Sequence, residues 1–129
     1  MIFRSKLFVA AILCVACGAV VVAGIAGASN RAKTKVTIHE ENGDFSGKVK
    51  SKRLHKCAEN RKVKVFKQSG QHQNPRNDTK IASDVSELDG DHGVWSTGNT
   101  AAPPGKYYAR ARKTSKCKGD SSRTVRVQN

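Results

Sequence analysis

The sequence has few aromatic residues and few acids. Phe, Trp and Tyr together make up 5% of the 129 residues, and 10 Asp and Glu stand against 24 Lys and Arg. So low an aromatic content argues against single-stranded or sequence-specific nucleic-acid binding, which depends on stacking side chains. The composition also argues against a large cofactor-binding enzyme, a coiled coil and a membrane protein with several spans.

Motifs of known catalytic sites do not occur in the sequence. It contains no Gly-x-Ser-x-Gly, no His-Glu-x-x-His and no phosphate-binding loop. The four histidines lack the tight spacing of zinc ligands; they are His39, His55, His72 and His92. Asp89-Gly90-Asp91 offers oxygens to Ca²⁺, but the full twelve-residue loop is missing, so a turn is the simpler interpretation. We therefore predict a protein that is not an enzyme and that uses no metal or cofactor.

The N-terminal segment has the pattern of an export signal. Arg4 and Lys6 precede an uncharged run over residues 7–28, which ends in the small-x-small sequence Ala26-Gly27-Ala28. This order is typical of a secretory signal helix that is cleaved behind the small residues Ala26 and Ala28. Retention as an anchor stays open, because 22 uncharged residues can span a bilayer core of about 30 Å. Lipidation at Cys17 is a third reading, but eleven more uncharged residues follow this cysteine, where a mature lipoprotein should turn polar.

Two cysteines, Cys57 and Cys117, lie outside the uncharged run. An even number of cysteines in a small exported domain predicts a disulfide, and here only one pairing exists. Closing a loop of about 60 residues would stabilise the domain by roughly 4 kcal/mol in the chain-entropy model. The alternative is two free thiols in a reducing compartment. Cys14 and Cys17, within the uncharged run, are interpreted as small hydrophobic residues.

The region after residue 34 shows no sustained 3.6-residue apolar period. Short runs of alternating apolar and polar residues, separated by Gly, Pro, Asn and Asp, are typical of β-strands. Seven runs fit this pattern: residues 35–40, 45–51, 61–68, 79–84, 93–97, 106–113 and 122–127. The sequence therefore predicts an all-β fold, a seven-stranded antiparallel two-sheet sandwich over residues 35–129, preceded by the N-terminal signal helix and a short tether at residues 29–34. Trp95 or Tyr107 is expected to fill the space between the sheets.

Three segments of the predicted sandwich carry recognisable fold motifs. Residues 81–84 (Ile-Ala-Ser-Asp) supply an Asp, Gly93-Val94-Trp95 a Gly-x-aromatic strand, and residues 104–109 a Pro-Gly-x-Tyr turn before a strand. Together they resemble the transthyretin-like (prealbumin-like) sandwich of carboxypeptidase regulatory-like domains, over roughly residues 36–127, and small exported actinobacterial proteins of that build. The segment from Asp84 to Gly93 is longer than the tight turn of that family. The resemblance implies a binding, spacing or structural module and brings no catalytic residues.

Positive charge is the strongest functional feature of the sequence. Arg4 and Lys6 are the only cations before residue 29, so 22 cations and 10 acids remain, a net charge of +12. Where valines and other small apolar residues face inward, the cations that alternate with them face outward. We expect these cations to form one basic plate: Lys48, Lys50, Lys52, Arg53, Lys62, Lys64, Arg110, Arg112 and Arg126. Such a plate attracts polyanions by Coulomb attraction and counterion release.

These features predict a secreted or cell-envelope binding module without enzymatic activity. Its expected partner is an anionic envelope polymer, a lipid headgroup or an acidic polysaccharide, with no sequence-specific nucleic acid and with membrane contact only through an uncleaved N-terminal segment. Two alternatives stay open: a generally cationic surface with no dedicated partner, and an accessory sandwich that docks on another protein without its own ligand. Asn77-Asp78-Thr79 also matches a glycosylation acceptor.

Overall fold

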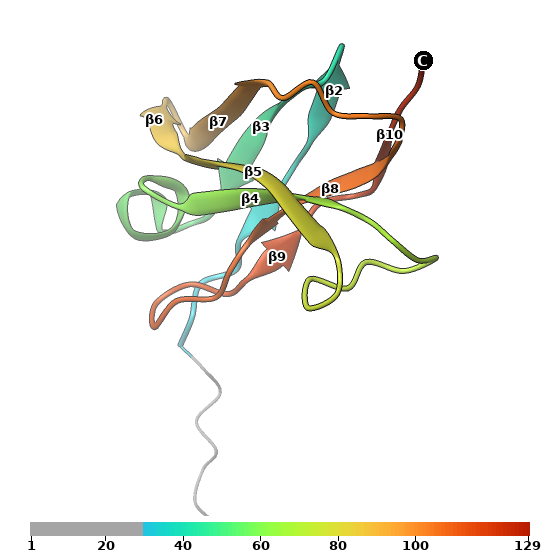
Figure 1. The fold of residues 1–129 in the computed structure, drawn as a ribbon. Coiled ribbons are helices and arrows are strands. Elements are labelled where there is room, and N and C mark those ends of the chain that lie inside the picture. Colours follow the sequence, from blue (N-terminus) through green and yellow to red (C-terminus); the bar gives the residue numbers. More distant parts are fainter. Residues whose placement is uncertain (1–29) are drawn as a thin grey trace, which may run out of the picture.

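The computed structural model describes residues 30–129, which form two antiparallel β-sheets around one hydrophobic core (Figure 1). The predicted export signal, with Ala26, Ala28 and the cysteines of the uncharged run, lies outside the described residues. Within residues 30–129, no helix combines the length and the apolar character that crossing a membrane requires. The prediction of an all-β fold with two antiparallel sheets is confirmed.

The first sheet has the strand order β1-β3-β7-β6, and β2 lies beside β3 on the same edge as β1. Its central pair is β3 (Asp44–Lys50) and β7 (His92–Asn99). The short strands β1 (Lys35–Val36) and β2 (His39–Glu41) both pair with β3. The strand β6 (Glu87–Asp89) pairs with β7 and forms the other edge.

The second sheet has the order β10-β8-β4-β5, with β9 also beside β8. Its centre is formed by β4 (Lys62–Lys67) and β8 (Gly105–Ala111). The edges are β5 (Thr79–Val85) on one side, and β9 (Asp120–Ser121) and β10 (Val125–Val127) on the other. One π-helical turn, Leu54–Ala58, connects the two sheets between β3 and β4.

The described residues form ten strands, not the seven predicted, and side-chain hydroxyls explain two of the additional breaks. Between β1 and β2, the Lys48 amide donates to the hydroxyl of Thr37 (2.9 Å), so the main-chain ladder is interrupted there. Between β9 and β10, the Ala109 amide donates to the hydroxyl of Ser122 (2.8 Å) in the same way. The third addition, β6, lies in the segment that was longer than a tight turn, and it forms a hairpin with β7 around Gly90 (φ 64°).

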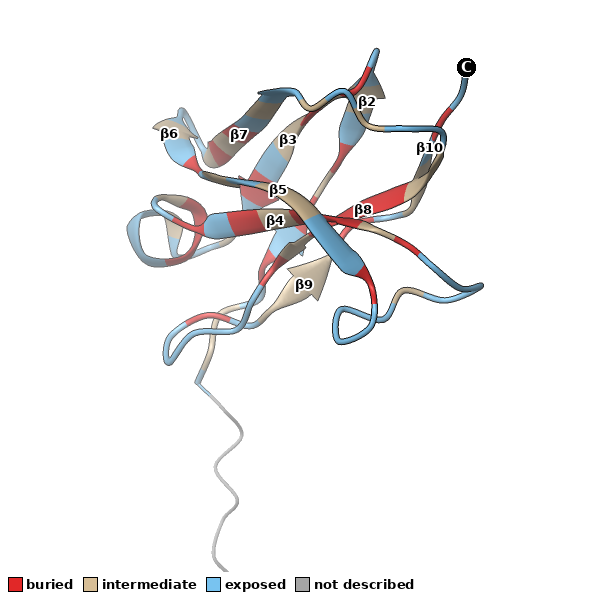
Figure 2. Cartoon of the chain, viewed as in Figure 1, coloured by how far each residue is buried: buried red, intermediate tan, exposed pale blue. Residues whose placement is uncertain are grey.

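The core contains residues from both sheets, and their alternation with exposed residues is visible along the strands in Figure 2. Its members are Val36, Ile38, Phe45, Val49, Val63, Val65, Trp95, Tyr107, Ala109, Ala111 and Val127. The expected inward positions on β4 and β8 are confirmed, and both Trp95 and Tyr107 lie between the sheets. Within the described residues, the core extends from Val36 to Val127 and joins the two sheets.

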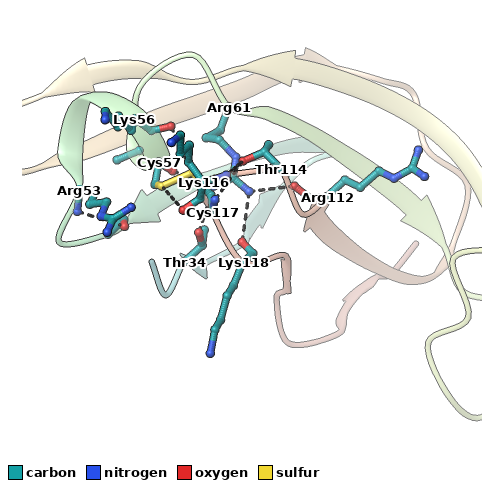
Figure 3. Close-up of a disulfide and its surroundings, with 12 residues drawn as sticks. Thr34, Arg53, Lys56, Cys57, Arg61, Arg112, Thr114, Lys116, Cys117 and Lys118 are labelled. Atoms are coloured by element: carbon teal, nitrogen blue, oxygen red, sulfur yellow. Dashed lines mark hydrogen bonds between the residues drawn. A yellow bond between two sulfur atoms is a disulfide. The ribbon is translucent and has the colours of Figure 1, made fainter. Parts of the chain in front are cut away.

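The predicted disulfide between Cys57 and Cys117 is present, and it joins the π-helical turn to the loop that follows β8 (Figure 3). The guanidinium of Arg61 is buried beside it, and burial lowers the pKa of this group. This guanidinium donates to four oxygens, namely Thr34 Oγ1 (3.0 Å) and the carbonyls of Cys57 (3.0 Å), Arg112 (2.9 Å) and Lys118 (3.3 Å). The disulfide and Arg61 therefore fasten the same two segments together.

The start of the described chain is held against the disulfide loop. The Ala32 amide donates to the Lys116 carbonyl (2.9 Å), and the Lys118 amide donates to the Ala32 carbonyl (2.8 Å). The segment that was predicted as a tether, residues 29–34, is thus fixed to the domain from Ala32 onward. The chain enters the sandwich at its disulfide end, and the C-terminus lies at the opposite end (Figure 1).

Candidate functional site

The nine cations that were predicted to form one basic plate lie on both sheets. Lys48 and Lys50 lie on β3 of the first sheet, and Lys52 and Arg53 follow in the connection to the π-helical turn. Lys62, Lys64, Arg110 and Arg126 lie on β4, β8 and β10 of the second sheet, and Arg112 directly follows β8. The prediction of one plate is wrong, because β3 pairs with β7 while β4 pairs with β8, so these strands contribute to separate sheets whose outer faces point apart.

The outer face of the first sheet carries charges of both signs. Lys48 on β3 lies opposite Val94 on β7, which in turn lies opposite Glu87 on β6. In the neighbouring row, His92 lies opposite Asp89. This face therefore carries both cations and acids, although Lys35 and Lys50 lie directly opposite each other at its edge.

The outer face of the second sheet concentrates charge of one sign. The strand register places Lys64 on β4 directly opposite Arg110 on β8, and the same row continues to Ser83 on β5 and Ser121 on β9. Arg110 Nη1 donates to Ser121 Oγ (2.8 Å), which holds the guanidinium in place. Like charges directly opposite one another destabilise a sheet. This row therefore keeps two adjacent cations at a cost in stability.

An aromatic pair lies beside this row on the same face. Phe66 on β4 lies opposite Tyr108 on β8, and the two rings are stacked with centroids 5.4 Å apart and planes inclined by 18°. Both side chains are buried, yet neither belongs to the core between the sheets. The loop between β4 and β5 covers them from outside through Asn74, Pro75 and Asp78.

The carboxylate of Asp78 fixes this loop to the sheet. Its Oδ2 accepts from the Tyr108 hydroxyl (2.7 Å) and the Asn74 amide (2.6 Å), and its Oδ1 accepts from the amide and the hydroxyl of Ser69 (both 2.9 Å). Burial by itself would raise the pKa of Asp78, but these hydrogen bonds outweigh it and lower the pKa to about 2. Burial, followed by the hydrogen bond to Asp78, raises the pKa of Tyr108. At neutral pH the pair is thus a carboxylate that accepts from a neutral phenol.

Loop and sheet together enclose a groove of about 450 Å³, which we call the cationic groove. Its lining consists of Lys64, Phe66, Asn74, Pro75, Arg76, Arg110 and Arg112. Four of these residues are cations and none is an acid, while Phe66 and Pro75 supply apolar surface. A volume of this size lies in the range of pockets that enclose small ligands.

The sequence predicted three residues of the cationic groove and missed two important ones. Lys64, Arg110 and Arg112 were expected as outward cations, and Lys62 precedes Lys64 by two positions on the same strand. Arg76 was missed because it lies in a loop outside the strands. The hydrogen bond of Asp78 to Tyr108 brings this loop over the sheet, and the sequence does not show that contact. The signal for Phe66 was available, since strict alternation along β4 places it on the face of Lys64.

The cations of the described chain are not neutralised by acids within the same chain. Over residues 30–129, no Lys or Arg side chain lies within 4.0 Å of a carboxylate, and the ion pairs involve histidine: His39–Glu41, His55–Glu59 and His92–Asp91. Other acids accept from main-chain amides, as Asp120 does from Val36 (2.7 Å) and Asp84 does from Ser96 (2.8 Å). The acids therefore shape the backbone and leave the cations free for external anions.

Lys50 and Lys52 line a separate depression of about 780 Å³ near the start of the described chain. Lys33, Lys35 and Arg123 line it as well, together with Asp91 and Asp120. Arg126, by contrast, lies on β10 opposite Lys106, outside both the depression and the cationic groove.

The residues that were considered for metal binding form part of a hairpin. Asp89, Gly90 and Asp91 form the end of the β6–β7 hairpin, and Asp91 Oδ1 lies 2.7 Å from His92 Nδ1. In the part of the chain that the structure describes, no three His, Cys, Asp or Glu side chains lie together as metal ligands would. The acceptor asparagine Asn77 is exposed at the end of the loop before β5.

No family model, no curated protein and no solved structure matches this chain. The role of the cationic groove must therefore follow from its own chemistry.

Proposed function

We propose that the protein is an exported, non-enzymatic binding module that holds a segment of an anionic polymer in the cationic groove. One observation carries the proposal: four cations and no acid line the groove, and two of them, Lys64 and Arg110, lie directly opposite each other on adjacent strands. A surface that serves only solubility intersperses the two signs of charge. The first sheet does so on its outer face, and the second sheet does not.

The lining residues favour a polymer that combines anionic groups with an apolar face. A guanidinium can bind a phosphate, sulfate or carboxylate through two parallel hydrogen bonds, and three of the four cations are arginines. Arg110 is already positioned by Ser121, so it loses less conformational freedom on binding. The exposed ring of Pro75 and the small accessible part of Phe66 offer apolar surface to the carbon face of a sugar or polyol. Acidic polysaccharides and polyol-phosphate polymers of the cell envelope carry both features.

The proposal also includes export of the protein and a transthyretin-like fold. The disulfide supports an oxidising compartment, in which such bonds form and persist. Cleavage after Ala28 would free the domain from residues 1–28, whereas retention of this run would keep the domain at a membrane. We also propose a transthyretin-like relationship, which rests on the sequence motifs and is supported by the two antiparallel sheets.

Retention on an immobilised sulfated polysaccharide at increasing salt tests the groove. The test variant reverses Lys64, Arg76, Arg110 and Arg112 to Glu. The matched control reverses four exposed cations outside the groove: Lys48, Lys56, Lys113 and Arg126. Both variants change the net charge equally, and both must first show the circular dichroism spectrum of the unmodified domain. We expect the groove variant alone to lose retention.

The outcome separates the proposal from its alternatives. Equal loss in both variants would mean that binding depends only on overall charge, and the groove proposal would be wrong. Retention that resists salt and survives both sets of reversals would favour the accessory module that docks on a partner protein, because apolar docking responds weakly to ionic strength.

A further inference from the structure

A second concentration of positive charge surrounds the point where the chain enters the domain. We call it the disulfide-end cluster, and its six exposed members are Lys33, Lys35, Lys52, Lys116, Lys118 and Arg123. Four of them line the depression between the start of the chain and β9. The other two lie in the loop that is hydrogen-bonded to Ala32, and in Figure 3 the side chain of Lys118 extends away from the sandwich.

Two acids near this cluster, Asp91 and Asp120, offset only part of its charge. Asp120 accepts from the Val36 amide (2.7 Å), and Asp91 is paired with His92 (2.7 Å). Within the described residues, no carboxylate lies within 4.0 Å of a lysine or arginine nitrogen. The six cations therefore present a positive surface at one end of the sandwich.

The connection to the uncharged N-terminal run is short. Residues 7–28 carry no charge, and Ala32 is already fixed to the disulfide loop by two main-chain hydrogen bonds. Only residues 29–31 lie between them, and three extended residues reach about 10 Å. This distance is about one Debye length at physiological salt. Cations at this end would therefore still be attracted by the anionic lipids of a membrane in which the run is embedded.

We propose that the disulfide-end cluster docks on anionic lipid headgroups and holds the domain against a membrane surface. The cluster belongs to the end of the sandwich, whereas the cationic groove lies on the outer face of the second sheet, so both can be occupied together. A lipid surface is favoured over a soluble polymer because the chain leaves the domain at this end toward a segment of membrane-spanning length. This proposal does not depend on what the groove binds.

Co-sedimentation with vesicles tests it on residues 29–129, which include the core between the sheets and the disulfide. One set of vesicles contains phosphatidylcholine alone, and the other also contains phosphatidylglycerol. The cluster variant replaces Lys33, Lys35, Lys52 and Lys118 by Gln, and the matched control replaces the four groove cations Lys64, Arg76, Arg110 and Arg112 by Gln. Each cation near an anionic surface contributes about fivefold to the partition coefficient, so four neutralisations predict a loss of about several hundredfold.

We expect the unmodified domain to sediment only with the anionic vesicles, the cluster variant to lose this partition, and the groove variant to keep it within a few fold. Equal loss in both variants, a larger loss in the groove variant, or no binding of the unmodified domain to anionic vesicles would overturn the proposal. Retention of the same proteins on the sulfated polysaccharide should show the reverse order, so failure of lipid docking and failure of the groove are distinguishable.

Discussion

Neutralising Lys64 should stabilise the fold and weaken polymer binding at the same time. In the register of β4 and β8, Lys64 lies directly opposite Arg110, and Cβ atoms in such pairs are about 4.5–5.5 Å apart. With the charged groups about 6–8 Å apart in a water-like dielectric, Coulomb repulsion is about 0.5–0.7 kcal/mol. Lys64→Gln removes this repulsion and keeps a polar side chain of similar length. For a domain of this size, the gain corresponds to a rise in Tm of about 2–5 °C.

Thermal unfolding followed by circular dichroism at low salt measures this gain, and the same samples are applied to the sulfated polysaccharide. The gain should shrink at high salt, because added ions screen exposed charges. Lys48→Gln is the control, since its opposite neighbours are Val94 and then Glu87, so it relieves no repulsion. A loss of stability in Lys64→Gln, or a gain that is independent of salt, would refute the idea that the row keeps unfavourable charge for binding.

Three further predictions concern the stability of the scaffold. Replacing Cys57 and Cys117 by Ser, 60 positions apart, should lower the free energy of unfolding by about 4 kcal/mol in the chain-entropy model, and calorimetry showing an unchanged Tm would contradict the role of the disulfide. Arg61→Met should cost several kcal/mol in urea denaturation, because it leaves buried carbonyls without a donor at about 1–3 kcal/mol each, whereas a cost below 1 kcal/mol would mean that water replaces the guanidinium. Because the folded-state pKa of Asp78 is depressed to about 2, its contribution is complete above the unfolded pKa of about 4 and is lost as the pH falls toward 2. Asp78→Asn should therefore lower stability at pH 7 and flatten its dependence on pH between about 4 and 2, and an unchanged acid transition would contradict this role.

Local patterns were sufficient to predict the inward residues and the disulfide. The alternation around Val63 and Val65 reflects the two-residue period of a strand, which needs no knowledge of its neighbours. The pairing of Cys57 with Cys117 followed from the cysteine count once Cys14 and Cys17 were assigned to the uncharged run. These features depend on composition and spacing, so the sequence carries them directly.

The strand breaks and the division of the charges could not be predicted in this way. The hydroxyls of Thr37 and Ser122 interrupt the ladders only because a partner amide lies opposite them, which is known once the strands are paired. Lys50 and Lys62 are close in sequence, yet β3 and β4 join different sheets. Which outward cations share a face is therefore decided by strand order, a property of contacts between distant segments.

The cationic groove combines both kinds of information. Its floor could be predicted, since alternation places Lys64 and Phe66 on one face of β4. Its wall could not, because Arg76 is brought over the sheet by the hydrogen bonds of Asp78, two to residues of its own loop and one to Tyr108 on β8.

Chemical-shift mapping of the ¹⁵N-labelled domain during titration with a soluble anionic oligosaccharide would test the groove most directly. We predict that the largest amide shifts occur at Lys64, Arg76, Arg110 and Arg112 and that they diminish as salt is added. Shifts that are largest on β3 and β7, or that spread evenly over all exposed lysines and arginines, would contradict a binding site on the second sheet.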